Sequence, residues 1–171
     1  PAFLPLISIT INICAGYIFT TLLNIKTKTL QVVVICLLTT FPAILSTFYY
    51  TYQTVLFSCG LFFAVAAVYL SGYLNWKNIV LGFLAFTLMM GSYQPSVSIY
   101  ATLCMVLSIA SIVDAKNEEF MPVFKTLITR ILTAIIGTIL YLLSIKITGA
   151  SSHATKSLEI KDIPNRVIEI I

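Results

Sequence analysis

The chain has 171 residues, of which 59% are hydrophobic and only 9% charged, and its mean hydropathy is +1.02. A soluble domain carries about 25% charged residues, so this composition excludes a soluble enzyme, a disordered tail and a nucleic-acid-binding domain. The net charge of +4 comes from ten Lys and Arg against six Asp and Glu. The basic residues are scattered rather than gathered into a phosphate-binding patch. The chain is expected to be an integral membrane protein.

Charge-free segments predict about six membrane spans, since one span needs roughly 20 apolar residues. Residues 1–25, 29–76, 78–113 and 131–145 carry no charge, and they have room for one, two, two and one spans. The predicted fold is therefore all-α and polytopic. The approximate spans are 3–24, 29–45, 55–73, 77–91, 96–113 and 127–147, of which the fourth is the shortest.

Each of the two longest segments contains an internal turn. Residues 46–54 are polar and aromatic, and residues 91–96 combine Gly91 with Pro95. Proline cannot continue a helix without losing a backbone hydrogen bond. Tyrosine is enriched where the apolar core of a membrane meets the headgroups. Both segments are therefore predicted to be loops at the membrane surface.

The distribution of Lys and Arg predicts the orientation. Loops with Lys26 and Lys28, with Lys77, and with Lys116 and Lys125 alternate along the chain with two Tyr-Gln loops that carry no cation. By the positive-inside rule the basic loops face the cytoplasm, and the Tyr-Gln loops face outward. Arg130, at the start of the last span, is expected to snorkel to the cytoplasmic side.

The two ends of the chain suggest how it is organised. Residues 1–148 are predicted to form one transmembrane helical domain. Residues 149–171 mix charged with apolar side chains and are predicted to begin an extracytoplasmic segment. Because residue 1 is proline, followed at once by an apolar run, and the charged tail stops abruptly, the chain is expected to be part of a longer protein.

Cysteine, histidine and the acids give no catalytic or metal-binding pattern, and no metal or cofactor is predicted. The four cysteines lie within predicted spans without zinc or redox spacing, so they are expected to act as small hydrophobic residues. His153 is expected to be solvated. The acids fall in one connector and in the tail, where solvated surfaces are expected: Asp114, Glu118, Glu119, Glu159, Asp162 and Glu169.

The two outward loops hold the candidate binding residues, Tyr52 and Gln53 in one and Tyr93 and Gln94 in the other. An aromatic ring can pack against the apolar face of a sugar while an amide bonds its hydroxyl groups. A belt of interfacial tyrosines, which needs no ligand, is the alternative. The residues alone leave both interpretations open.

These loops also carry a family resemblance. Gly-Ser-Tyr-Gln-Pro-Ser-Val-Ser-Ile-Tyr (91–100), between two apolar helices, resembles the signature of the serotype-converting O-antigen glucosyltransferases (Gtr type II), which phages and bacteria encode. Tyr49-Tyr50-Thr51-Tyr52-Gln53, leading into residues 56–70, resembles the preceding outer loop and helix of that family. The resemblance covers most of residues 40–115.

The resemblance implies a fold related to lipid-dependent (GT-C-like) glycosyltransferases. It implies transfer of a glucosyl group from a polyprenyl-phosphate carrier to a surface polysaccharide, on the periplasmic side of the bacterial inner membrane. The implied partners are this lipid-linked donor, a lipid-linked polysaccharide acceptor and membrane lipids, with no nucleic acid.

The resemblance assigns binding residues but no catalytic one. It carries over Tyr93 and Gln94 and, less directly, Tyr52 and Gln53. The acidic catalytic positions of the family are expected upstream of Pro1, so the chain alone is expected to be inactive. Two other classes stay open: a transporter or flippase fragment for a lipid-linked sugar or small solute, and a non-catalytic membrane subunit.

Overall fold

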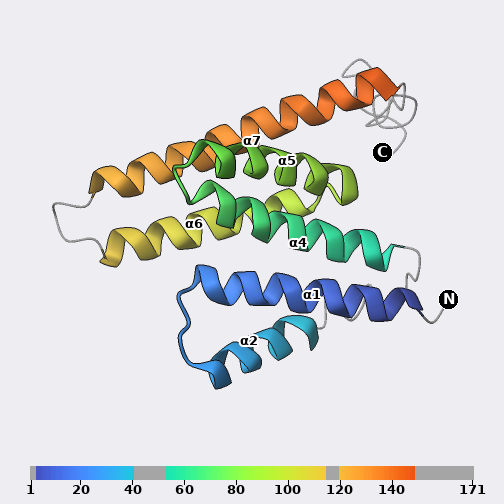
Figure 1. Ribbon diagram of the computed structural model, residues 1–171. Coiled ribbons are helices and arrows are strands. Elements are labelled where there is room, and N and C mark those ends of the chain that lie inside the picture. The colour runs from blue at the N-terminus through green and yellow to red at the C-terminus, as the bar shows by residue number, and fades with distance from the viewer. Residues whose placement is uncertain (1–2, 41–52, 115–119, 149–171) are drawn as a thin grey trace, which may run out of the picture.

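The computed structural model describes residues 3–40, 53–114 and 120–148, and every regular element in these ranges is a helix. Four helices are long and apolar enough to cross a membrane, namely α1, α4, α6 and α7. The predicted class, an all-α polytopic membrane protein, is confirmed. The helices are α1 (Phe3–Leu22), α2 (Lys28–Thr40), α4 (Thr54–Ser71), α5 (Trp76–Ser92), α6 (Ser96–Asp114) and α7 (Phe120–Thr148), as Figure 1 shows.

Each helix overlaps one predicted span, and the largest difference in bounds is at α7. This helix begins at Phe120, whereas the predicted span begins at residue 127. The added residues include Pro122 and Lys125. Proline is tolerated in the first turn of a helix because the N–H it lacks would have no partner there, and a lysine outside the apolar core needs no burial. The apolar pattern therefore predicts the membrane-embedded part of α7 rather than the whole helix.

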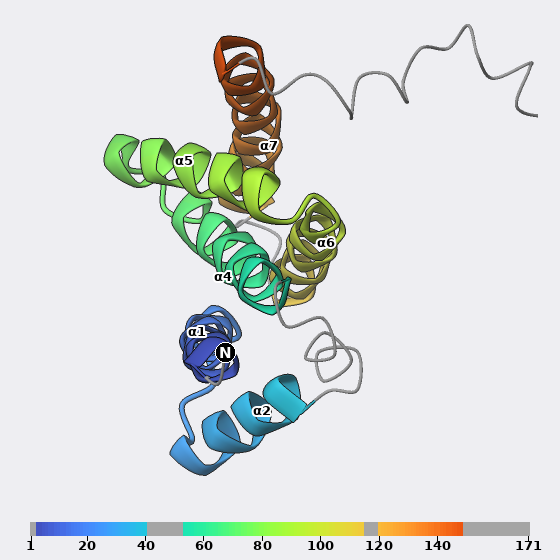
Figure 2. The ribbon, with the colours of Figure 1, turned by 90° about the vertical axis from the view of Figure 1, so that its right-hand side faces the viewer.

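Helix α4 is the centre of the bundle and contacts α1, α5, α6 and α7 (Figure 2). Its buried positions are mostly small, with Gly60, Ala64 and Ala67 among them. Small side chains let helix backbones approach closely in a membrane. The larger core side chains beside them come from α4 itself and from its neighbour α5: Val65, Val68, Phe86 and Met89.

The connections place two distinct ends on the bundle. At one end, the turn from Gly72 to Asn75 joins α4 to α5, and Asn75 caps α5 by accepting a hydrogen bond from the backbone N–H of Lys77 at 3.4 Å. At the other end, Tyr93, Gln94 and Pro95 join α5 to α6. We call these the Gly72 end and the Gln94 end. The last turns of α6 and the first turns of α7 extend past the α4–α5 turn (Figure 1).

Hydroxyl groups within the helices bond mainly to the backbone of their own helix. Thr133 donates to the carbonyl of Thr129 at 2.8 Å, and Thr138 donates to that of Ala134 at 2.7 Å. Thr87 of α5 bonds the carbonyl of Phe83 at 2.8 Å and also reaches that of Gly137, on α7, at 3.2 Å. Such bonds satisfy polar groups that lipid cannot satisfy.

Arg130 differs from its expected position. The expectation was a side chain that snorkels from the start of the last span, but only 8% of Arg130 is exposed. The hydroxyl of Tyr100, on α6, donates to its carbonyl oxygen at 2.8 Å. A Cβ atom added at Gly72 would lie 3.7 Å from Nη2 of Arg130. The side chain is enclosed by α4, α6 and α7, because Gly72 leaves room beside it and Tyr100 binds its backbone carbonyl.

Candidate functional site

The Tyr93–Pro95 turn is tightly hydrogen-bonded. The backbone N–H of Tyr93 still bonds the carbonyl of Met89 at 2.9 Å, and Tyr93 itself is extended, with φ −157° and ψ 98°. Beyond Pro95, the N–H of Ser96 bonds the carbonyl of Tyr93 at 3.0 Å. The hydroxyl of Ser98 donates to the carbonyl of Pro95 at 2.7 Å. The turn thus fixes where the Tyr93 and Gln94 side chains begin.

Tyr93 packs against α4. Its ring centroid lies 4.8 Å from that of Phe57, with the two rings tilted by 53°. One turn further along α4, a Cβ atom at Gly60 would lie 2.8 Å from Cβ of Tyr93 and 2.5 Å from Oγ of Ser96. Only a residue without a side chain allows this approach. Tyr93 is therefore partly buried, and its ring is held rather than free in the interface.

Gln94 joins the turn to α7. Its Nε2 donates a hydrogen bond to the hydroxyl of Tyr141 at 2.9 Å. The Gln94 side chain is exposed, and this is the one hydrogen bond it makes within the described part of the chain. A glutamine amide has two donors and an acceptor oxygen, so one N–H and the oxygen remain available to a ligand.

Gln53 lies at the same end of the bundle, at the start of α4. It is exposed, its side chain does not cap the helix, and its carbonyl oxygen accepts a hydrogen bond from the N–H of Phe57 at 2.9 Å. Phe57 contacts the ring of Tyr93, and Gln53 lies one helical turn before Phe57. Tyr52, the other predicted residue of that loop, lies outside the described residues.

Two residues of the site, Phe57 and Tyr141, were not predicted from the sequence. Phe57 was one of many apolar residues in its helix, and no local pattern marks it as the partner of Tyr93. Tyr141 is 47 positions from Gln94 along the chain, and its pairing depends on how α5 and α7 pack. A tyrosine near the end of a span was its only signal, and that signal also fits an interfacial belt.

In the part of the chain that the structure describes, three buried oxygen atoms in the same half of the bundle have no hydrogen-bond partner. They are Oγ of Ser96, beside Gly60, and Oγ of Ser8 and Oδ1 of Asn12 on α1. An unpaired buried polar group costs roughly 1–3 kcal/mol in protein mutational data. The site thus combines aromatic rings, an exposed amide and the buried hydroxyl oxygen of Ser96. Within the described residues the one carboxylate is Asp114, at the end of α6 and away from this site.

The family comparison covers the whole chain. The family model for the glucosyl transferase GtrII matches residues 1–171. No curated protein and no solved structure matches the chain. The match confirms the resemblance seen in residues 91–100, and it identifies a transferase rather than a transporter. The chain therefore belongs to the GtrII glucosyl transferase family.

Proposed function

We propose that the chain forms the membrane part of an enzyme that moves a glucosyl group from a polyprenyl-phosphate carrier to a surface polysaccharide of the O-antigen type. The Gln94 end faces the periplasm, and the protein resides in the bacterial inner membrane. The observation that carries the proposal is the Tyr93–Gln94 turn, braced by Phe57 of α4 and Tyr141 of α7 in a chain of the GtrII family.

The side chains at this turn suit a neutral sugar. The remaining N–H and the oxygen of the Gln94 amide match the donor and acceptor character of hexose hydroxyls. The Tyr141 hydroxyl lies next to them. The ring of Tyr93 supplies an apolar surface. Tyr52 and Gln53, from the preceding loop, are proposed to complete the sugar contacts from the side of α4.

The surface beside the turn suits a lipid carrier. Tyr141 is followed along α7 by Leu142 and Leu143, and Ile139 precedes it; all three are exposed. A polyprenyl chain in the bilayer would contact these side chains as ordinary lipid does. Its phosphate and sugar would then reach the level of Gln94 from the side, without the lipid leaving the membrane.

The test compares two variants of the full protein that break the same hydrogen bond. Tyr141→Phe removes the acceptor of the Gln94 bond and keeps the ring, whereas Gln94→Ala removes the whole amide. One uncharged hydrogen bond is worth about 0.5–1.5 kcal/mol, which corresponds to about a two- to tenfold loss of rate. We expect Tyr141→Phe to stay in this range and Gln94→Ala to lose more, up to about a hundredfold.

The assay is glucosylation of lipid-linked polysaccharide in membranes, with expression matched by immunoblot. The double variant, Gln94→Ala with Tyr141→Phe, separates two roles of the Gln94 amide: bracing α7 and binding the sugar. If Gln94 only braces α7, both single variants and the double variant lose activity equally. Full activity in Gln94→Ala and in Tyr93→Ala would remove the turn from the site and return it to an interfacial aromatic belt.

A second experiment tests the orientation. In a variant lacking the four native cysteines, single cysteines at Thr51 and Ser92 are expected to react with a membrane-impermeant reagent added to the periplasmic side. A cysteine at Asn117, in the basic connector, is expected to react only after the membrane is permeabilised. The opposite pattern would place the Gln94 end in the cytoplasm and contradict a periplasmic sugar site.

A further inference from the structure

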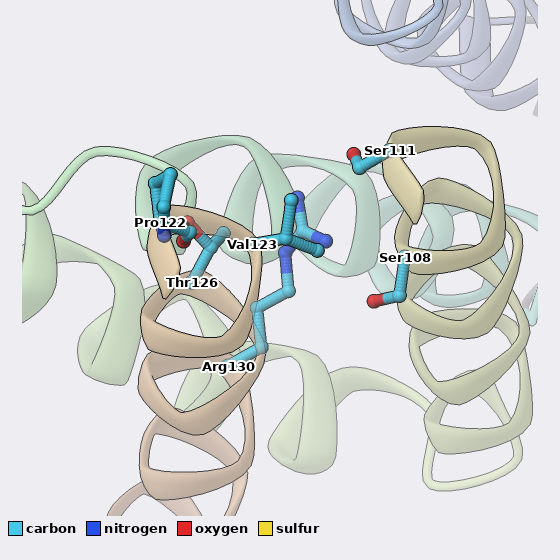
Figure 3. A pocket seen from close by; sticks show the side chains of 6 residues that line it. All are labelled: Ser108, Ser111, Pro122, Val123, Thr126 and Arg130. Atoms are coloured by element: carbon cyan, nitrogen blue, oxygen red, sulfur yellow. Dashed lines mark hydrogen bonds between the residues drawn. The ribbon is translucent and has the colours of Figure 1, made fainter. Parts of the chain in front are cut away.

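A cavity with polar groups in its lining lies between α6 and α7 toward the Gly72 end, away from the Gln94 turn. Its volume is about 180 Å³, which is room for several water molecules at about 30 Å³ each. The inner wall is buried and the rim is exposed. The lining residues are Ser108 and Ser111 of α6 and Pro122, Val123, Thr126 and Arg130 of α7 (Figure 3).

Arg130 supplies a buried positive charge to this cavity. Figure 3 shows its side chain running between the two helices, toward Val123 and Ser111. It is 8% exposed, and its Nε atom has no hydrogen-bond partner among the described residues. Taking an ion out of water costs several kcal/mol unless a partner compensates. A guanidinium has five N–H donors and no acceptor, so the compensating group must be an acceptor, preferably an anion.

The described helices hold a single carboxylate, Asp114, which is the last residue of α6. Residues 3–113 and 120–148 contain no Asp or Glu. Among the described residues, four lysines lie at or near the Gly72 end, namely Lys26, Lys28, Lys77 and Lys125. Lys146, in the last turn of α7, lies at the Gln94 end. In the described part of the chain the Gly72 end is therefore positive.

Three hydroxyl groups complete the lining. Each donates to a backbone carbonyl of its own helix: Ser108 to Cys104 at 2.6 Å, Ser111 to Leu107 at 2.8 Å, and Thr126 to Pro122 at 3.0 Å. Such side-chain bonds supplement the backbone bonds of a helix. A hydroxyl can therefore turn toward a bound anion while the carbonyl keeps its backbone partner. Guanidinium and hydroxyl donors together suit an oxyanion such as phosphate.

The Tyr100 hydroxyl holds the backbone of Arg130, and the side chain lies beside Gly72 in the α4–α5 turn. From Arg130 to the end of α7 at Thr148 the helix rises about 27 Å. This is close to the thickness of the hydrocarbon core, about 30 Å. With the end of α7 at one boundary of the membrane, Arg130 would lie at the other, where lipid headgroups begin.

We propose that the α6–α7 cavity is an oxyanion site that binds the phosphate of a membrane-lipid headgroup at the Gly72 end of the bundle. The bound phosphate neutralises Arg130 and ties together α6 and α7. The site lies at the opposite end from the Tyr93–Gln94 turn, so it does not depend on the proposed glucosyl transfer. Free phosphate shares the same chemistry, and the experiment distinguishes the two sources.

The experiment measures thermal unfolding of the full protein in uncharged detergent after its lipids have been removed. Dihexanoyl phosphatidylglycerol, dihexanoylglycerol without phosphate, and inorganic phosphate are titrated separately. The variants are Arg130→Gln, which removes the charge, and Ser111→Phe, which blocks the rim at an exposed position and keeps the arginine. Lys125→Gln is the matched control, because it removes a cation of the same helix that does not line the cavity.

We expect the phospholipid, but not dihexanoylglycerol, to raise the unfolding temperature of the wild type. Loss of a hydrogen bond to a charged group is worth about 1.5–3 kcal/mol. Arg130→Gln is therefore expected to weaken the apparent affinity at least about tenfold, and Ser111→Phe to abolish the stabilisation. Lys125→Gln is expected to keep the affinity within about twofold. If Arg130→Gln does not fold, Ser111→Phe against Lys125→Gln still decides.

Equal phospholipid affinity in the wild type and Ser111→Phe would overturn the proposal. Stabilisation by inorganic phosphate alone would overturn the lipid as its source. A third outcome would assign the counter-charge to a carboxylate of α6 or of the connector. If Asp114→Asn, or Glu118→Gln with Glu119→Gln, destabilises the protein as much as Arg130→Gln does, and the effects are not additive, then a carboxylate pairs with Arg130 and no external anion is needed.

Discussion

Helices α4 and α7 are equally apolar, yet their surroundings differ. In the most apolar 18-residue window of each helix, 50% of α4 but only 11% of α7 is buried inside the protein. The difference follows from side-chain size. The contact face of α4 carries Gly60, Ala64 and Ala67, whereas α7 presents isoleucine and leucine around most of its circumference. Apolarity puts a helix into the membrane, and small residues decide whether other helices can surround it.

The largest effect is expected at the closest contact of α4. In Gly60→Leu the new side chain would overlap Tyr93 and Ser96, because even its Cβ would lie 2.8 Å from Cβ of Tyr93. Tyr93 cannot move away without opening the α5–α6 turn. We expect most of the folded, detergent-stable protein to be lost, as measured by size-exclusion chromatography.

Gly91→Leu is the matched control for that loss. Gly91 also lies in a helix close to the same turn, but a Cβ atom there meets nothing within 4 Å. A normal yield for Gly91→Leu with a low yield for Gly60→Leu attributes the loss to packing. Equal yields of the two variants would show that α4 is not closely surrounded at this point.

A smaller effect is expected where α7 has its own close contact. A Cβ atom at Gly137 would lie 2.7 Å from Cδ1 of Phe86, whose ring packs edge-on against Tyr100 at 4.9 Å. Gly137→Ala must therefore displace a buried ring, and overpacking of this kind typically costs about 1–3 kcal/mol. The measurement is thermal unfolding in detergent.

Gly82→Ala serves as the control for Gly137→Ala. The atoms around a Cβ at Gly82 lie 3.6–3.8 Å away, which is ordinary contact distance. We expect Gly82→Ala to leave the unfolding temperature nearly unchanged. If Gly137→Ala is equally harmless, then α7 is held to α5 more loosely than the structure indicates, and the contrast with α4 becomes sharper.

The smallest effect is expected on the exposed face of α7. Leu142 is 58% exposed, so Leu142→Val changes only the contact with lipid, and we expect a change within about 0.5 kcal/mol. Val68, on α4, is fully buried, and Val68→Leu is expected to cost about 1–3 kcal/mol by overpacking. A large loss of stability in Leu142→Val would mean that this face of α7 packs against protein rather than lipid.

Much of the fold could be predicted because charge is so scarce in this sequence. The charge-free segments mark apolar helices, and Gly91 with Pro95 marks the turn between α5 and α6. The early start of α7 was not predicted, because Pro122 and Lys125 precede the apolar pattern although the helix continues through both. The membrane-crossing of the shorter helices α2 and α5 stays a prediction.

The candidate site was predictable only where it is local. The pair Tyr93–Gln94 was identified from its own segment, and the family match confirms the resemblance that this segment carries. Phe57 and Tyr141 reach the pair only through helix packing, so no spacing in the sequence predicts them. The enclosure of Arg130 has the same origin, since it depends on Gly72 and Tyr100, each far from it along the chain.

Helix α5 has a further consequence for the membrane itself. Its 17 residues span about 26 Å, less than the roughly 30 Å of a typical hydrocarbon core. If α5 crosses the membrane, as predicted, the bilayer is expected to thin slightly around it. The Tyr93–Gln94 turn directly continues α5, so we expect it to lie where the bilayer is thinnest. A sugar attached to a lipid would reach the turn while its carrier remains at the depth of its neighbours.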